Sequence, residues 1–173
     1  MFRLTALILT LALSTPAFAQ EAEPSMTPER LAGILLVLDA EAQTAPGQIQ
    51  LSIADVPVLV VMDVAANRMR AMVPIASADQ LTDQDLARMM QANFDTALDA
   101  RYAIAQGRIW GVFIHPLAEL EREQLISGIA QTVNLARTYG TLYSGGAIVF
   151  GGGDSSGLYQ DLFEELLERG QDI

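Results

Sequence analysis

The sequence contains no cysteine and no lysine, and it holds a single histidine and a single tryptophan among its 173 residues. Without cysteine the chain can form no disulfide, no thiolate zinc site and no thiol nucleophile. Without lysine every basic residue is an arginine, so the lysine of a phosphate-binding loop is missing as well. A lone imidazole lacks the partners that a metal site or a catalytic triad needs. These absences argue against an enzyme.

Basic residues are scarce compared with acidic ones. The chain has 10 arginines and 21 Asp and Glu residues, for a formal net charge of −11. This charge opposes binding to nucleic acids and to anionic lipids, which both require a basic face. Hydrophobic residues make up 51% of the chain, which argues against disorder. The length is sufficient for one hydrophobic core.

The first nineteen residues have the pattern of a secretory signal peptide. Arg3 is the only charged residue among them, and an apolar stretch follows over Leu4–Leu13. The small-x-small sequence Ala17-Phe18-Ala19 predicts cleavage after Ala19, which leaves Gln20 as the new terminus and a net charge of −12. The apolar stretch is too short for a membrane anchor, since a spanning helix needs about 20 residues. We therefore expect export to the periplasm without stable insertion into the membrane.

Hydrophobic periodicity then predicts a helix followed by three strands. Thr27 is suited to cap a helix that has Pro28 at its first position, and the apolar stripe continues to about Gln43. Alternating or continuous apolar residues predict strands over Ile49–Ile53, Val58–Val64 and Arg68–Ile75. The short connections between them indicate an antiparallel meander.

A second helix should begin at Thr82, with Asp85 completing a variant of the capping box. Its predicted buried stripe consists of Leu86, Met89, Met90, Phe94 and Ala97. Two further strands are expected over Arg101–Ala105 and Arg108–His115, then a long helix over about Glu119–Tyr139, which Gly140 should end. A last amphipathic helix is predicted over Leu158–Arg169, with its apolar stripe formed by Leu158, Leu162, Phe163, Leu166 and Leu167.

This order of elements predicts an α+β fold with an antiparallel sheet of about five strands flanked by helices. The predicted organisation is a signal peptide over residues 1–19, a flexible tail over 20–26, one α+β domain over 27–140, and an extension over 141–173. The extension combines a glycine-rich segment with the last helix.

The same order, together with local patterns, resembles the type III secretion chaperone-like superfamily and, within it, the YbjN-like proteins. The resemblance covers about Thr27–Gly140, and it is carried by the segments Val56–Ile75, Met89–Asp95 and Arg101–Leu117 and by the long helix after them. It implies a module that dimerises and binds polypeptide segments. The secretion chaperones act in the cytoplasm, whereas this chain begins with an export signal.

One motif suggests catalysis, because Gly153-Asp154-Ser155-Ser156-Gly157 matches the G-x-S-x-G pattern of a nucleophile elbow. A hydrolase of that type needs a histidine after the serine, but His115 precedes Ser155. As a calcium loop the segment fails too, because Leu158 stands where an oxygen ligand is needed. We interpret Ser155 or Ser156 as a helix cap, and we predict no catalytic, metal or cofactor site.

A binding site is predicted on the strands instead. Val58–Val64 has apolar residues on both faces, and Arg68 and Arg70 share one face of the next strand. The candidate partner-binding residues are Val58, Val60, Met62, Arg68 and Arg70. Arg68 and Arg70 suit an acidic partner or the second subunit of a dimer, although pairing with carboxylates across the sheet is an alternative. The last helix could fold back and cover the same surface.

The sequence therefore favours an exported, non-enzymatic interaction or chaperone-like protein of the YbjN-like type. Its expected partner is a protein or peptide, and a homodimer is possible. Two alternatives stay open at this point: a small serine hydrolase that uses Ser155, and a purely structural component of the cell envelope.

Overall fold

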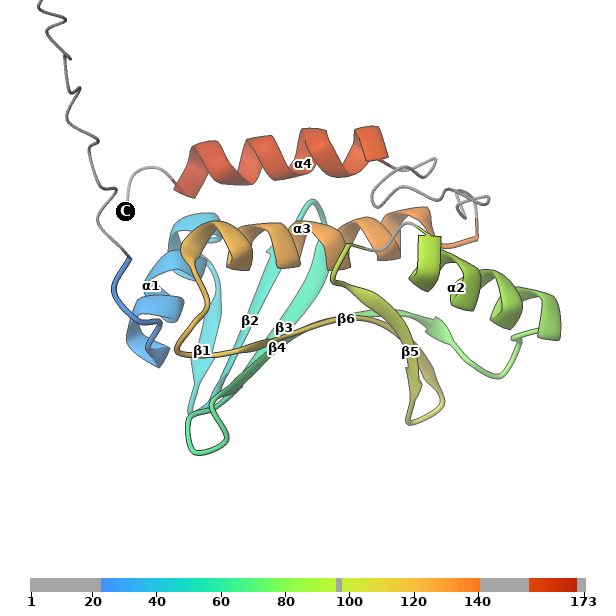
Figure 1. The fold of residues 1–173 in the computed structure, drawn as a ribbon, viewed down its shortest axis with the longest axis horizontal. Helices are drawn as coiled ribbons and strands as arrows, with labels where there is room; N and C mark the ends of the chain where they lie inside the picture. Colours follow the sequence, from blue (N-terminus) through green and yellow to red (C-terminus); the bar gives the residue numbers. More distant parts are fainter. Residues whose placement is uncertain (1–22, 96–97, 141–155, 171–173) are drawn as a thin grey trace, which may run out of the picture.

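The computed structural model describes residues 23–95, 98–140 and 156–170 (Figure 1). The elements in chain order are α1 (Pro28–Leu38), β1 (Gln43–Ala45), β2 (Gln48–Ile53), β3 (Val56–Asp63), β4 (Arg68–Ser77), α2 (Asp83–Asp95), β5 (Arg101–Ala105), β6 (Arg108–Pro116), α3 (Arg122–Thr138) and α4 (Ser156–Arg169). The strands form one antiparallel sheet in the order β1-β2-β3-β4-β6-β5. The α+β fold predicted from the sequence is confirmed, with six strands in place of about five.

The additional strand is β1, which arises because α1 ends at Leu38, before the predicted end at about Gln43. Asp39 leaves the helix in an extended conformation, and its carboxylate accepts the backbone N–H groups of Glu41 at 3.0 Å and Ser52 at 2.8 Å. Asp39 thereby ties the end of α1 to β2. The chain that follows is held against β2 and pairs with it as the edge strand of the sheet.

The predicted helix boundaries are mostly confirmed. Thr27 caps α1 by accepting the Arg30 N–H at 3.2 Å. At α2, the Thr82 hydroxyl accepts the Asp85 N–H at 3.2 Å, and the Asp85 carboxylate accepts the Thr82 N–H at 3.1 Å, as in a capping box. The long helix begins at Arg122, later than predicted. Among the described residues, no helix is long and apolar enough to cross a membrane.

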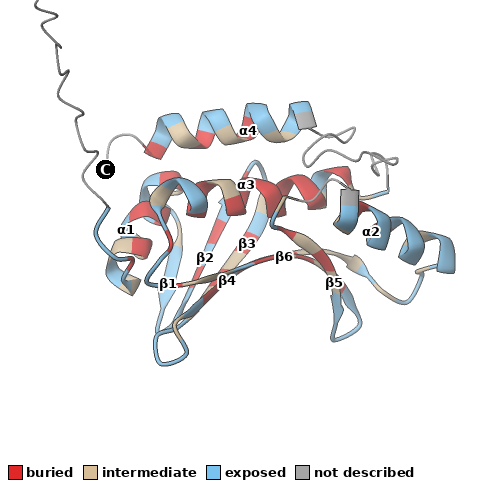
Figure 2. Ribbon diagram, viewed as in Figure 1, coloured by how far each residue is buried: buried red, intermediate tan, exposed pale blue. Residues whose placement is uncertain are grey.

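The molecule is built in three layers (Figure 1). Alternation along the strands buries one face of the sheet, as the pattern of β2 illustrates with Ile49, Leu51 and Ile53 inside. Helix α3 lies across this face, and α1 and α2 stand at opposite ends of it. Helix α4 packs on the side of α3 that faces away from the sheet. Because α3 has neighbours on both sides, even its polar residues Gln131, Thr132 and Asn134 are buried (Figure 2).

Two glycines allow α3 to approach the sheet closely. A β-carbon added to Gly128 would lie 2.5 Å from the ring of Phe113 on β6. One added to Gly111 on β6 would lie 3.1 Å from the Thr132 carbonyl oxygen and 3.5 Å from Leu135. Helix and strand therefore each have a glycine where the other element needs space.

Candidate functional site: the open face of the sheet

The face of the sheet opposite α3 carries no helix among the described residues (Figure 1). Strand alternation turns a set of large apolar side chains toward this open face, and the antiparallel register lines them up in rows across the strands. One row joins Leu59, Met72 and Val112, and the next joins Val61, Arg70 and Ile114. The apolar residues of the open face are Leu59, Val61, Met72, Pro74, Trp110, Val112 and Ile114.

Most of these side chains are half-buried by their neighbours on the sheet, whereas Ile114 is 53% exposed. A hollow of about 470 Å³ opens beside Ile114. Val61 and Ile114 are among its apolar lining residues, and its charged lining residues are Arg68, Arg70 and Asp63. The site can therefore accept a ligand that combines apolar groups with negative charge.

The two arginines at this hollow have different neighbours, because Asp63 lies directly opposite Arg68 in the β3–β4 pair. Arg68 donates a hydrogen bond to the Asn67 carbonyl oxygen at 2.9 Å. The pKa of Glu119 is lowered mainly because the Asn67 side-chain amide donates to its carboxylate at 2.9 Å, and the positive charge of Arg68 lowers it further. Arg70 stands between Val61 and Ile114 in its row, so its immediate cross-strand neighbours are apolar.

The five residues predicted to bind a partner lie on two different faces. Val58 and Val60 are fully buried beneath the helices, and Met62 is half-buried on the same side of β3. Arg68 and Arg70 are exposed on the open face. A partner on the open face would therefore meet Leu59 and Val61, the alternate residues of the same strand. The sequence showed that β3 is apolar on both sides, but it did not show which side the helices cover.

The predicted position of the last helix also needs correction. The sequence suggested that this helix could cover the surface used for binding. In the structure, α4 instead packs on α3, with Leu162 and Leu166 buried and Phe163 and Leu167 half-buried. The open face therefore lies on the opposite side of the molecule from α4 (Figure 1).

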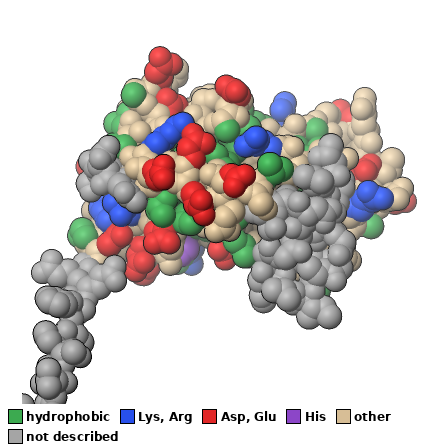
Figure 3. Space-filling view, turned by 90° about the horizontal axis from the view of Figure 1, so that it is seen from above, with side chains coloured by type: hydrophobic (Ala, Val, Ile, Leu, Met, Phe, Trp, Pro, Cys, Tyr) green, Lys and Arg blue, Asp and Glu red, His purple; other side chains and the backbone are tan. Residues whose placement is uncertain are grey.

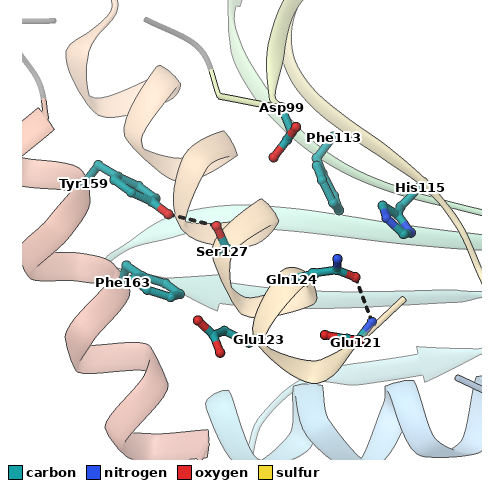
Figure 4. A pocket seen from close by; sticks show the side chains of 9 residues that line it. All are labelled: Asp99, Phe113, His115, Glu121, Glu123, Gln124, Ser127, Tyr159 and Phe163. Atoms are coloured by element: carbon teal, nitrogen blue, oxygen red, sulfur yellow. Dashed lines mark hydrogen bonds between the residues drawn. The ribbon is translucent and has the colours of Figure 1, made fainter. Parts of the chain in front are cut away.

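A second hollow, of about 530 Å³, lies between α3, α4 and β6 (Figure 4). Beside it the Tyr159 and Ser127 hydroxyl groups are 2.8 Å apart, and Gln131 donates to Ser127 at 3.1 Å. The Gln131 side-chain oxygen Oε1 accepts the backbone N–H groups of Asp99 and Ala100 at 2.7 and 2.9 Å. These bonds link α4 through α3 to the start of β5. These hydrogen bonds are structural, and they give both the oxygen and the nitrogen of the Gln131 side-chain amide a partner.

The prediction of a buried stripe on α2 is largely wrong. Met89 is buried as expected, but Leu86, Met90 and Phe94 are exposed, with Phe94 at 78%. Ala97 lies outside the described residues. Helix α2 stands at the edge of the sheet beside β5, so only its face with Met89 and Ala92 is covered. Asn93 fixes this position by accepting the Tyr102 N–H at 2.7 Å and donating to the Tyr102 carbonyl oxygen at 3.2 Å.

Of the residues considered for catalysis, the structure describes His115. Ser155 lies outside the described residues. The Nδ1 atom of His115 is 2.8 Å from the carbonyl oxygen of the adjacent Pro116. Within the described ranges, no group of three or more His, Cys, Asp or Glu side chains is placed to hold a metal ion.

Comparison with known proteins finds no matching family model and no matching curated protein. Among solved structures, the chain is similar to one in the HopA1-SchA chaperone–effector complex, with 14% identity and a TM-score of 0.47 over 65% of this chain and 97% of that one. It is also similar to one in the ExsC-ExsE complex, with 14% identity and a TM-score of 0.43 over 53% of this chain and 75% of that one. Likenesses at this level do not establish a function.

Proposed function

We propose that the protein is an exported, non-enzymatic interaction module of the chaperone-like, YbjN-like type, which holds a polypeptide segment on the open face of its sheet. The observation that carries this proposal is the set of apolar side chains on β3, β4 and β6 that no described helix covers. A sheet face normally packs against another layer, and this face has Ile114 exposed among apolar neighbours that are only half-buried, which suits it to contact a partner. The hollow beside Ile114 supplies a place for a side chain of the partner.

Replacing Ile114 tests this site. Ile114→Asp is expected to weaken binding of a short fluorescein-labelled peptide of leucine and glutamine by tenfold or more, as measured by fluorescence anisotropy. The reason is that burial of an isoleucine side chain contributes about 1.5–3 kcal/mol, and 1.4 kcal/mol corresponds to a factor of ten.

The matched control is Leu158→Asp, which puts the same charge on a similarly exposed apolar position of α4, on the other side of the molecule. This variant should bind the peptide as the wild type does. Circular dichroism checks that both variants stay folded. Equal binding by Ile114→Asp and the wild type would contradict the assignment of the site to the open face.

We further propose that the protein forms a homodimer through α2. Leu86, Met90 and Phe94 follow one another at intervals of four residues, so they form an apolar stripe along one side of the helix. A symmetric contact between two such stripes would cover all three side chains. Phe94→Glu should therefore shift sedimentation equilibrium toward the monomer. The exposed Leu36→Glu on α1 is the control, and a dimer that withstands Phe94→Glu would contradict this interface.

The proposed compartment is the periplasm. The apolar stretch Leu4–Leu13 and the sequence Ala17-Phe18-Ala19 support cleavage after Ala19. Intact-mass measurement on protein from a periplasmic extract should give a chain that begins at Gln20. A soluble protein that retains Met1 would show that the segment is not a cleaved signal.

A further inference from the structure

Basic residues outnumber acidic ones in the strands of this protein, although the chain as a whole is acidic. The six strands contain four arginines, Arg68, Arg70, Arg101 and Arg108, and a single acidic residue, Asp63. The register turns all four arginines toward the open face. The whole chain has 21 acidic residues, so nearly all of them lie outside the strands. The opposite side of the molecule, over α4, carries many of these carboxylates (Figure 3).

Arg70 presents positive charge that no carboxylate faces across its described strand pairs, whereas Arg68 has Asp63 directly opposite it on β3. Among the described residues, ion pairs join Arg30 to Glu23 and Arg169 to Glu165, on the helical side. Arg70 emerges between two apolar residues, Val61 and Ile114, at the hollow. A guanidinium in such a setting binds carboxylates by charge-assisted hydrogen bonds, while its apolar neighbours bind apolar side chains.

The shape of the open face indicates what can fit it. The sheet is arched, so that the β3–β4 and β5–β6 hairpins project on either side of the open face (Figure 1). A rod such as a helix can lie under the arch, whereas a flat surface would touch the hairpin tips first. Arg68 and Arg70 are two residues apart on one strand, which separates them by about 6–7 Å.

We propose, building on the function proposed above, that the occupant of the open face is an acidic amphipathic helix of a partner protein. The helix lies between the two hairpins and crosses β3, β4 and β6, with carboxylates on Arg68 and Arg70 and with apolar residues on Ile114 and Val61. An anionic membrane is a poorer fit, because the face is concave and the rest of the protein repels it. A second copy of this chain is a poorer fit as well, because the exposed apolar stripe on α2 offers a separate surface for self-association.

The test uses three labelled helical peptides that share the same leucines and differ in having glutamate, glutamine or lysine at the polar positions. The wild type should bind the glutamate peptide at least fivefold more tightly than the glutamine peptide, and increasing salt should reduce this difference. A protein with a net charge of −11 would favour the lysine peptide if only its overall charge mattered. Preference for glutamate therefore reports the local arginines.

The decisive variant is the double substitution Arg68→Glu and Arg70→Glu, which should invert the preference from the glutamate to the lysine peptide. Arg137→Glu, at the exposed end of α3, makes a charge change of the same kind and should leave the preference unchanged. Equal affinity for glutamate and glutamine peptides would overturn the acidic helix while leaving the proposed function standing. Absence of binding by any peptide would overturn both.

Two further outcomes would assign the face to another occupant and overturn the proposal. One is co-sedimentation with phosphatidylglycerol vesicles that the double variant loses, without any preference among the peptides. The other is self-association of the wild type, in sedimentation equilibrium, that the double variant abolishes while Phe94→Glu does not affect it.

Discussion

Gly128→Ala is expected to lower the free energy of unfolding by about 1–3 kcal/mol, the range that overpacking of a core produces. The new β-carbon would lie 2.5 Å from two atoms of the Phe113 ring and 2.7 Å from a third. Phe113 lies on β6 and is buried against α3, so its ring cannot rotate into solvent. The strain should exceed the gain in helix propensity, which is about 1 kcal/mol for glycine to alanine.

The control for this prediction is Gly33→Ala on α1. A β-carbon at Gly33 would have no neighbouring atom within 4 Å, and the residue is exposed in the interior of the helix. This variant should therefore be more stable than the wild type by about 0.4–1 kcal/mol. Urea denaturation of both variants shows whether their free energies of unfolding change in opposite directions. Two variants that shift stability in the same direction would mean that α3 does not approach β6 as closely as described.

Deletion of residues 154–173 is expected to destabilise the protein by several kcal/mol and to increase binding of an apolar dye. The deletion removes α4, whose Leu162 and Leu166 are buried, and burial of each leucine contributes about 1.5–3 kcal/mol. It also uncovers apolar residues of α3 such as Ile126, whose side chain lies against Gly170. The open face should keep its affinity for the peptide of leucine and glutamine, because α4 does not touch it.

Single substitutions in α4 show how much of the lost stability comes from its packing, because they leave the length of the chain unchanged. Leu166→Ala, at a position only 1% exposed, should cost about 2–5 kcal/mol. Leu158→Ala on the same helix, at a position 42% exposed, should cost less than half as much. A truncated protein that is as stable as the wild type and binds no dye would contradict the packing of α4 on α3.

Local signals in the sequence predicted most elements of the fold. The Thr27 and Thr82 caps and the alternation in β2 and β4 depend on neighbouring residues alone, so they could be recognised without the structure. The end of α1 was missed because it depends on Asp39 accepting the backbone N–H of Ser52, thirteen residues away. An interaction across that distance has no counterpart in a local periodicity.

The binding surface was predicted only in part, because amphipathic patterns do not reveal which element covers which face. Val58 and Leu59 are equally apolar in the sequence, yet the helices bury Val58 and leave Leu59 on the open face. The stripe of Leu86, Met90 and Phe94 has helical spacing, which normally indicates burial, but α2 extends along the edge of the sheet. Arg68 and Arg70 were identified correctly as sharing a face, because strand alternation alone determines it.

Chemical-shift mapping on the isotopically labelled mature protein tests the open face most directly. Addition of the peptide of leucine and glutamate should perturb the amides of β3, β4 and β6, with the largest changes around Val61, Arg70 and Ile114. The amides of α2 and α4 should stay unperturbed, because these helices lie outside the open face. Perturbations confined to the stripe of α2, or to the hollow between α3 and α4, would contradict the assignment of the open face as the binding surface.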